Sequence, residues 1–262
     1  MAPNLLNILS PNNIIIFMLV FTRMTGIIQS APFFSTLNMP VMVKLWFCAT
    51  IAFLIYPIVY TQKIYILPHN APEFAILLAI EFFIGFLIGF LANLFLEGVG
   101  MCGRLLSIQT GLAMSEALDP ISGMNSSELA RIYIYLTTLV FISTGAHQLI
   151  FTTLFNSFQA VPMGVFPAFD ENIVNLTMKI SSQIFVIAFN LALPIFSVLF
   201  TCDVLLGMTS KMMPQMNIYM VALPVKIYLG LILIYIFLDS VIVYLQGALG
   251  KFMYMINTVF SG

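Results

Sequence analysis

Six stretches of this chain are mostly apolar, and each is about 20 residues long or longer. A helix of about 20 apolar residues crosses the hydrocarbon core of a membrane. Charged residues make up only 7% of the chain, against roughly a quarter in soluble globular domains, so a soluble fold could not solvate its surface. The sequence therefore predicts an all-α, membrane-associated protein whose candidate spans are 12–31, 41–61, 74–97, 131–158, 173–202 and 217–246.

Each stretch departs from a plain lipid-facing helix, because it contains an ionisable residue or a proline. A proline inside a helix removes a backbone donor and bends the helix, which membrane bundles tolerate where neighbouring groups satisfy the freed carbonyl. Such interruptions are common in channels and transporters and uncommon in single membrane anchors. We therefore expect kinked helices that contact other helices, with interruptions at Arg23, Lys44, Pro57, Glu81, His147, Pro194, Pro224, Lys226 and Asp239.

The third stretch carries a charge and small residues on one helical face. At 100° per residue, Glu81, Gly85, Gly89 and Ala92 fall within about 80° of one another. A charge in hydrocarbon is costly unless it meets protein or water, and small residues let a second helix approach closely. Glu81 could carry a proton, but no second acid or histidine lies near it in its stretch. We interpret Glu81 as a structural carboxylate bonded to a neighbouring subunit.

Arg23 lies in the first stretch, where Thr22, Gly26, Gln29 and Ser30 form a stripe of polar or small residues. An arginine near the end of a span can extend to the headgroups and leave the hydrocarbon. The stripe favours the other interpretation, in which Arg23 contacts protein.

Two acids belong to the last two long stretches. Asp203 and Asp239 are expected near the ends of these helices. We interpret each as a helix-end charge at an interface.

Residues 97–131 form the most polar region of the chain, and within it 109–115 is rich in small residues. This segment is too polar to face lipid and too apolar for an ordinary exposed loop. Non-helical backbone at membrane depth lines a cavity or is buried in protein. We therefore predict a re-entrant loop or plug, in preference to a plain cytoplasmic loop.

Several functions find no support in the residues. The net charge of −1 argues against nucleic acid, which requires a clustered basic face. Cys48, Cys102 and Cys202 are far apart and form no metal-ligand spacing, so we expect structural thiols and no metal or cofactor. His147 lies among small residues and is interpreted as a packing residue rather than a proton relay. The acids and hydroxyls form no catalytic pattern, so we expect no enzyme.

The order and spacing of many short motifs resemble the FliR family of flagellar type III export gates, whose injectisome counterparts are called SctT. The similarity covers about residues 10 to 250. The matching residues are Arg23 with Gly26, Ala31-Pro32-Phe33-Phe34-Ser35, Met39-Pro40, Glu81 with Gly85 and Gly89, Gly103, Gln109-Thr110-Gly111, Asp119-Pro120, Gly145, His147, Pro194, Asp203 with Gly207, Pro214-Gln215-Met216-Asn217 and Pro224-Val225-Lys226.

This resemblance implies a single-copy subunit of a right-handed helical assembly with several FliP-type and FliQ-type subunits. Residues 1–180 would form FliP-like kinked hairpins, and 181–262 a fused FliQ-like hairpin. Such a gate lies in the bacterial inner membrane at the flagellar basal body, as a multi-pass protein. Unfolded flagellar proteins would pass through it, and energy coupling would reside in FlhA-type and FlhB-type partners.

The resemblance also implies roles for particular residues. A plug loop would cover about 106–125, but this loop has no aromatic residue, so any bulky-ring seal would come from elsewhere. The residues nearest the constriction would be Gln109, Gly111, Leu112, Met114 and Ser115. The charges and glycines expected to contact other subunits are Arg23, Gly26, Glu81, Gly85, Gly89, Asp203 and Lys226.

Three other functions remain open from the sequence. The gate could belong to a virulence injectisome instead of a flagellum. A stand-alone secondary transporter would show internal repeats, and none is apparent. A purely structural scaffold would keep its closed state after deletion of the predicted plug loop, whereas a plug would then leak ions.

Overall fold

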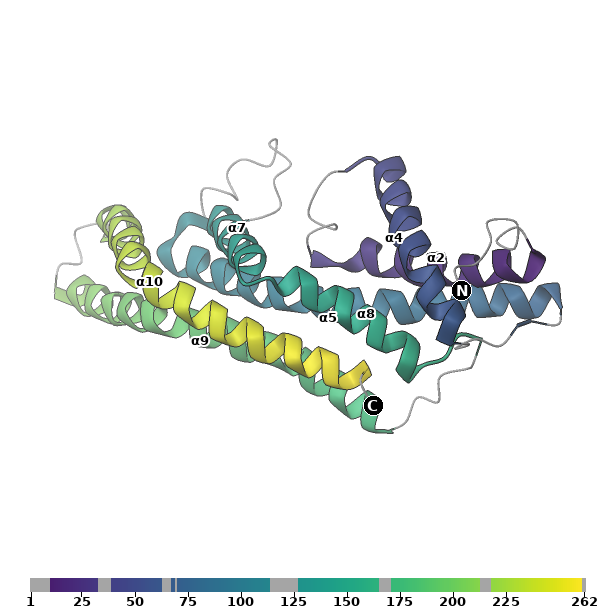
Figure 1. The fold of residues 1–262 in the computed structure, drawn as a ribbon. Coiled ribbons are helices and arrows are strands. Elements are labelled where there is room, and N and C mark those ends of the chain that lie inside the picture. Colours follow the sequence, from purple (N-terminus) through teal and green to yellow (C-terminus); the bar gives the residue numbers. More distant parts are fainter. Residues whose placement is uncertain are drawn as a thin grey trace. The chain divides into compact units, whose positions relative to one another are not determined.

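The computed structural model describes residues 10–32, 39–62, 67–68, 70–113, 127–164, 171–212 and 218–260. Within these ranges every regular element is an α-helix, which confirms the predicted all-α class (Figure 1). The helices are α2 (Pro11–Ser30), α4 (Val41–Gln62), α5 (Ala71–Thr110), α7 (Glu128–Ser143), α8 (Ala146–Ala160), α9 (Glu171–Met212) and α10 (Ile218–Phe260).

Five of these helices are long and apolar enough to cross a membrane, namely α2, α4, α5, α9 and α10. A sixth apolar segment consists of α7 and α8, which are bent by 68° at the break between them. Each of these segments overlaps one of the six stretches that the sequence predicts as candidate spans, although several extend beyond the predicted bounds. Pro57, Pro194 and Pro224 lie inside α4, α9 and α10, so none of the three prolines ends its helix.

The break between α7 and α8 lies at Gly145, where the sequence predicts one continuous stretch. Gly145 has a φ of 71°, in the left-handed region that glycine adopts without steric cost. The backbone N–H of Thr144 still donates to the Val140 carbonyl at 2.9 Å, and the Gln148 N–H donates to the Gly145 carbonyl to begin α8. The left-handed backbone of Gly145 therefore accounts for the break between α7 and α8.

Three helices are longer than one membrane crossing needs. Helices α5, α9 and α10 contain 40, 42 and 43 residues. At 1.5 Å per residue each is about 60 Å long, roughly twice the thickness of the hydrocarbon core. A simple topology of six perpendicular spans would not accommodate helices of this length.

The chain divides into two compact units. Unit 1 comprises residues 1–94, 145–181 and 251–262, and its core includes buried side chains of α2 such as Leu19 and Met24. Helix α2 also packs against α4, where the rings of Phe17 and Tyr56 are 6.5 Å apart.

Unit 2 comprises residues 95–144 and 182–250. Helices α9 and α10 run side by side there (Figure 1). The Asn190 amide donates to the Tyr244 hydroxyl at 3.1 Å, and Lys226 lies 2.7 Å from Asp203. Because the partner residues on α10 decrease in number as those on α9 increase, this part of the two helices is an antiparallel hairpin.

Candidate functional site

The glycines of the predicted contact face lie where α2 crosses α5, inside unit 1. A Cβ built on Gly85 would overlap the backbone carbonyl of Arg23, and one on Gly26 would overlap the backbone of α5 at Phe82. A Cβ on Gly89 would come within 2.6 Å of the Ile27 carbonyl oxygen. Since the obstructing atoms are largely backbone, only glycine permits these two helices to approach so closely.

Arg23 of α2 and Glu81 of α5 form a buried ion pair at this crossing. The Arg23 Nε donates to Glu81 Oε2 at 2.6 Å, and the two side chains are 0% and 1% exposed. Arg23 also donates to the Ser157 hydroxyl at 3.2 Å and to the Val161 carbonyl at 3.1 Å. Its guanidinium lies 4.3 Å from the ring centre of Phe158. Such bonds compensate for the cost of burying the guanidinium.

The groups that contact Arg23 and Glu81 in the structure belong to this chain, whereas the sequence suggests a neighbouring subunit. The prediction that Arg23 and Glu81 meet protein rather than lipid agrees with the structure, but their described partners belong to the same chain. Neither side chain retains surface for a second chain. Residues of α2, α5 and α8 contact these side chains within unit 1, and the inter-subunit contact predicted for Arg23, Gly26, Glu81, Gly85 and Gly89 stays a prediction.

A second polar cluster lies in unit 2 and joins three helices. Asp203 on α9 accepts a hydrogen bond from the Gln109 amide of α5 at 2.7 Å. Its other oxygen is 2.7 Å from the ammonium of Lys226 on α10. We call these three residues the α5–α9–α10 cluster. It unites a residue predicted for the plug with two predicted for subunit contact.

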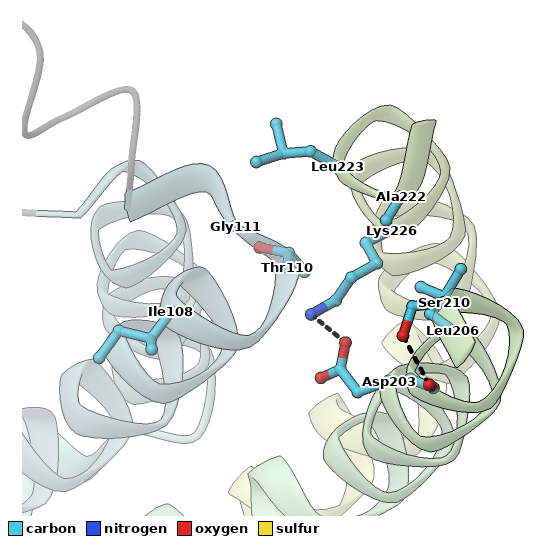
Figure 2. Close-up of a pocket in the computed structure, with 10 residues that line it drawn as sticks. Ile108, Thr110, Gly111, Asp203, Leu206, Ser210, Ala222, Leu223 and Lys226 are labelled. Atoms are coloured by element: carbon cyan, nitrogen blue, oxygen red, sulfur yellow. Dashed lines mark hydrogen bonds and ion pairs between the residues drawn. The ribbon is translucent and has the colours of Figure 1, made fainter. Parts of the chain in front are cut away.

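The cluster borders a cavity of about 390 Å³. Figure 2 shows the Lys226 ammonium directed at the Asp203 carboxylate, with Thr110 of α5 and the following Gly111 beside them. The Lys226 and Asp203 side chains are 17% and 37% exposed, so this pair remains accessible, unlike the pair in unit 1. The cavity is lined by Ile108, Thr110, Gly111, Asp203, Leu206, Gly207, Ser210, Ala222, Leu223 and Lys226.

Helix α5 ends at the cavity. Gly111 has a φ of 84°, and its N–H donates to the Ile108 carbonyl at 3.2 Å, which closes the last turn. Thr110 is buried and lies where Gly230 of α10 leaves room for it. The sequence predicts that the plug loop begins near Leu106, whereas the structure is helical through Thr110. Leu106 is itself buried in unit 2, which extends the helix.

The remaining plug residues are only partly described. Leu112 lies just beyond Gly111 and is half-buried. Met114 and Ser115, like most of the predicted plug at 106–125, lie outside the described residues. Their proposed position at a constriction stays a prediction.

Some partners in these sites are not identifiable from the sequence alone. Ser157 and the Val161 carbonyl complete the bonding of Arg23, although they are far from it along the chain. One signal was present, since Thr153 and Ser157 are one helical turn apart in an apolar helix and both are buried. A polar stripe of this kind predicts a buried polar partner.

Loss of the Asp203 charge should loosen the α5–α9–α10 cluster. In Asp203→Asn the partly buried Lys226 ammonium loses its counter-ion, and we expect the free energy of unfolding to fall by about 1 to 2 kcal/mol, with the solvent exposure of Asp203 limiting the loss. Chemical unfolding of the purified chain in detergent measures it. Asp203→Asn in a Lys226→Met background should cost less, and an equal cost in both backgrounds would contradict the pairing.

Long apolar helices, buried charges paired between helices, and a cavity at the end of α5 define a polytopic helical membrane protein. A protein-family model described as bacterial export proteins, family 1, matches residues 14–252. The chain belongs to this family, which confirms the predicted FliR family.

The sequence of this chain is also similar to individual proteins of bacterial export systems. The flagellar biosynthetic protein FliR of Bacillus subtilis (strain 168) is 27% identical over 235 residues, covering 88% of this chain and 89% of the relative. FliR of Escherichia coli (strain K12) is 29% identical over 210 residues, covering 80% and 78%. The surface presentation of antigens protein SpaR of Shigella flexneri is 32% identical over 135 residues, covering 51% of each chain.

Proposed function

We propose that this chain is a core subunit of the flagellar type III secretion export gate and helps to form the entry pore for unfolded flagellar proteins. The observation that carries the proposal is the family match across residues 14–252, nearly the whole chain. The chain would act in the bacterial inner membrane at the flagellar basal body. FliP-type and FliQ-type subunits would assemble with it, and FlhA-type and FlhB-type proteins would supply energy coupling. The role is structural and requires no catalytic residue.

The share of this chain that aligns with each relative favours a flagellar role over an injectisome role. The two FliR relatives align with 80% or more of this chain, whereas the SpaR alignment covers 51% of it. The SpaR similarity nevertheless makes a virulence export gate the second candidate. Both functions share the same class of pore and the same class of cargo, namely unfolded protein.

We further propose that the α5–α9–α10 cluster supports the plug. Gln109 and Gly111 lie where α5 ends, near the start of the segment predicted to close the pore. Because Gln109 is bonded to Asp203, and Asp203 to Lys226, the start of that segment is tied to the α9–α10 hairpin. A plug anchored in this way could yield to a passing chain while its base stays in place.

A bulky residue at Gly111 should alter gating more than assembly. Gly111→Leu forces a branched side chain into a φ of 84°, which costs roughly 1 to 2 kcal/mol locally and misdirects the chain that follows. We expect increased ion leakage through the closed gate, measured as inner-membrane permeability in cells producing the complex. Normal leakage together with loss of co-purifying subunits would reverse this assignment.

Genetic replacement tests the proposal as a whole. The full-length chain should restore flagellar protein export and swimming in a strain whose own FliR gene is deleted, with export measured as secreted flagellin. A matched injectisome-deleted strain tests the second candidate. Restoration only in the second strain would assign the chain to the injectisome, and restoration in neither, with normal protein levels, would contradict both.

A further inference from the structure

Helix α4 of unit 1 buries one face and exposes the opposite one. Its buried side chains recur at helical spacing, and the ring of Tyr56 among them contacts Phe17 of α2. Only 17% of the apolar window of α4 is buried, so most of its surface is open. The exposed residues opposite the buried ones form what we call the outer face of α4: Met42, Val43, Trp46, Thr50, Phe53, Leu54, Ile58 and Thr61.

The length of α4 suits a single crossing of the hydrocarbon core. Its 22 residues extend over about 33 Å, and the core is about 30 Å thick. Helices α5, α9 and α10 are each about twice as long, so a position along them does not define a depth in the bilayer. In α4 it does. Leu54, in the middle of the outer face, lies within the core when the helix crosses the membrane.

The outer face of α4 makes no polar demand on its surroundings. From Leu45 to Gln62 the sequence contains no Asp, Glu, Lys, Arg or His. The Thr50 hydroxyl donates to the Trp46 carbonyl at 2.9 Å, and the Thr61 hydroxyl donates to the Ile58 carbonyl at 2.9 Å. Because acyl chains provide no hydrogen-bond partner, a face that meets them must satisfy its hydroxyl groups within the protein.

The residues near the two ends of α4 suit the membrane surface. Lys44 and Trp46 lie near its start, and Tyr60 lies near its end. Tryptophan and tyrosine are enriched at the level of the headgroups, and a lysine there keeps its ammonium in water while its stem covers apolar surface. Trp46 is 74% exposed, so its ring is available to the surroundings of the helix. An apolar middle between such ends is the pattern of a surface that faces a bilayer.

We propose that the outer face of α4 contacts the acyl chains of the bilayer, with Lys44 and Trp46 at the level of the phospholipid headgroups. The inference goes beyond the proposed function, because it assigns which surface of the chain faces lipid and at what depth. It rests on the length, burial and composition of one helix, and not on the identity of the other subunits.

Trp46 is the one tryptophan of the chain, which makes the lipid contact measurable. The chain, assembled with FliP-type and FliQ-type subunits, is placed in phosphatidylcholine vesicles whose acyl chains carry bromine either near the headgroup or near the chain end. Subtraction of the emission of a Trp46→Phe complex isolates the emission of Trp46. Bromine quenches tryptophan on contact, so this emission should fall in both lipids, and further with bromine near the headgroup.

Two results of the quenching measurement would overturn the proposal. Unchanged emission in both brominated lipids would show that protein covers the outer face. Stronger quenching by the deep bromine would contradict the placement of Trp46 at the headgroups.

Arginine at two positions of the outer face tests the depth independently. Leu54→Arg places a guanidinium in the middle of the core, and the amount of chain in the membrane should fall roughly tenfold or more. Met42→Arg is the matched control, since Met42 is equally open but lies at the start of α4. An arginine there reaches the headgroups, so the amount should stay within about twofold of wild type. Equal effects of the two substitutions, whether harmless or damaging, would overturn the proposal.

Alanine at Leu54 separates lipid from a protein partner. Lipid fills the space that a shortened side chain leaves, so Leu54→Ala should retain the wild-type amount of co-purified subunits. Loss of those subunits would overturn the proposal and leave the proposed function intact. If the wild-type chain assembles with neither subunit, the proposed function fails, and the emission of Trp46 is then measured for the chain alone in the same vesicles, with the same result expected.

Discussion

Removal of either charge of the buried pair in unit 1 should be among the most damaging single substitutions in the chain. In Glu81→Leu the Arg23 guanidinium stays 0% exposed and loses its shortest bond, the 2.6 Å contact to the carboxylate. Breaking a buried pair in this way costs about 3 to 5 kcal/mol, since one charge remains buried without compensation. We expect a matching loss in the free energy of unfolding, or failure to accumulate in membranes.

The double variant Arg23→Met, Glu81→Leu separates the penalty of an unpaired charge from the loss of packing. An apolar pair of similar size often replaces a buried ion pair with little net change. Ser157 would remain bonded through its hydroxyl to the Leu154 carbonyl at 2.6 Å, although Val161 would lose a donor. The double variant should therefore be more stable than either single variant. A double variant no better than the worse single variant would contradict the pairing.

A side chain at Gly85 should separate α2 from α5. In Gly85→Leu the new Cβ meets the Arg23 backbone carbonyl, and backbone cannot move aside as a flexible side chain can. The variant should lose several kcal/mol, about 3 or more, because overpacking here also displaces the ion pair next to it. Thermal unfolding of the purified chain in detergent should show a lower midpoint or no cooperative transition.

Gly247→Leu provides the matched control for this experiment. Gly247 also lies inside a long helix, α10, but no atom is within 4 Å of a Cβ built on it. Leucine has a higher helix propensity than glycine, so this variant should unfold at or slightly above the wild-type midpoint. Equal destabilisation by the two substitutions would show that bulk in the helix, and not the α2–α5 contact, causes the loss.

The helical periodicity of the sequence predicts which face of α5 needs a protein partner, but not which partner. Glu81 and its glycines share one face, and this much follows from 100° per residue. Arg23 lies 58 positions away, and periodicity within one helix carries no information about such long-range pairing. The partner that the structure gives Glu81 within the chain, Arg23, could for this reason not be predicted from the sequence. Six apolar stretches, by contrast, follow from local composition alone and correspond to the observed helices.

Helix ends were harder to predict than helices. The apolar stretch at 217–246 suggests an end near Gln246, but Phe252 and Ile256 are buried and prolong α10 to Phe260. Asp239 therefore changes from an expected helix-end charge to a charge in the middle of the helix. Polar residues near 106–110 likewise suggest a loop, yet packing of Leu106 keeps α5 helical until Gly111. In both cases tertiary burial outweighs local polarity.

We propose that this chain is one subunit of a multi-chain export gate. Native mass spectrometry of the tagged chain, purified after co-production with FliP-type and FliQ-type subunits, measures the composition of the assembly. We expect one complex that contains a single copy of this chain together with several copies of the other two. A spectrum of the 29.2 kDa chain alone, whether or not the other subunits are co-produced, would contradict the claim.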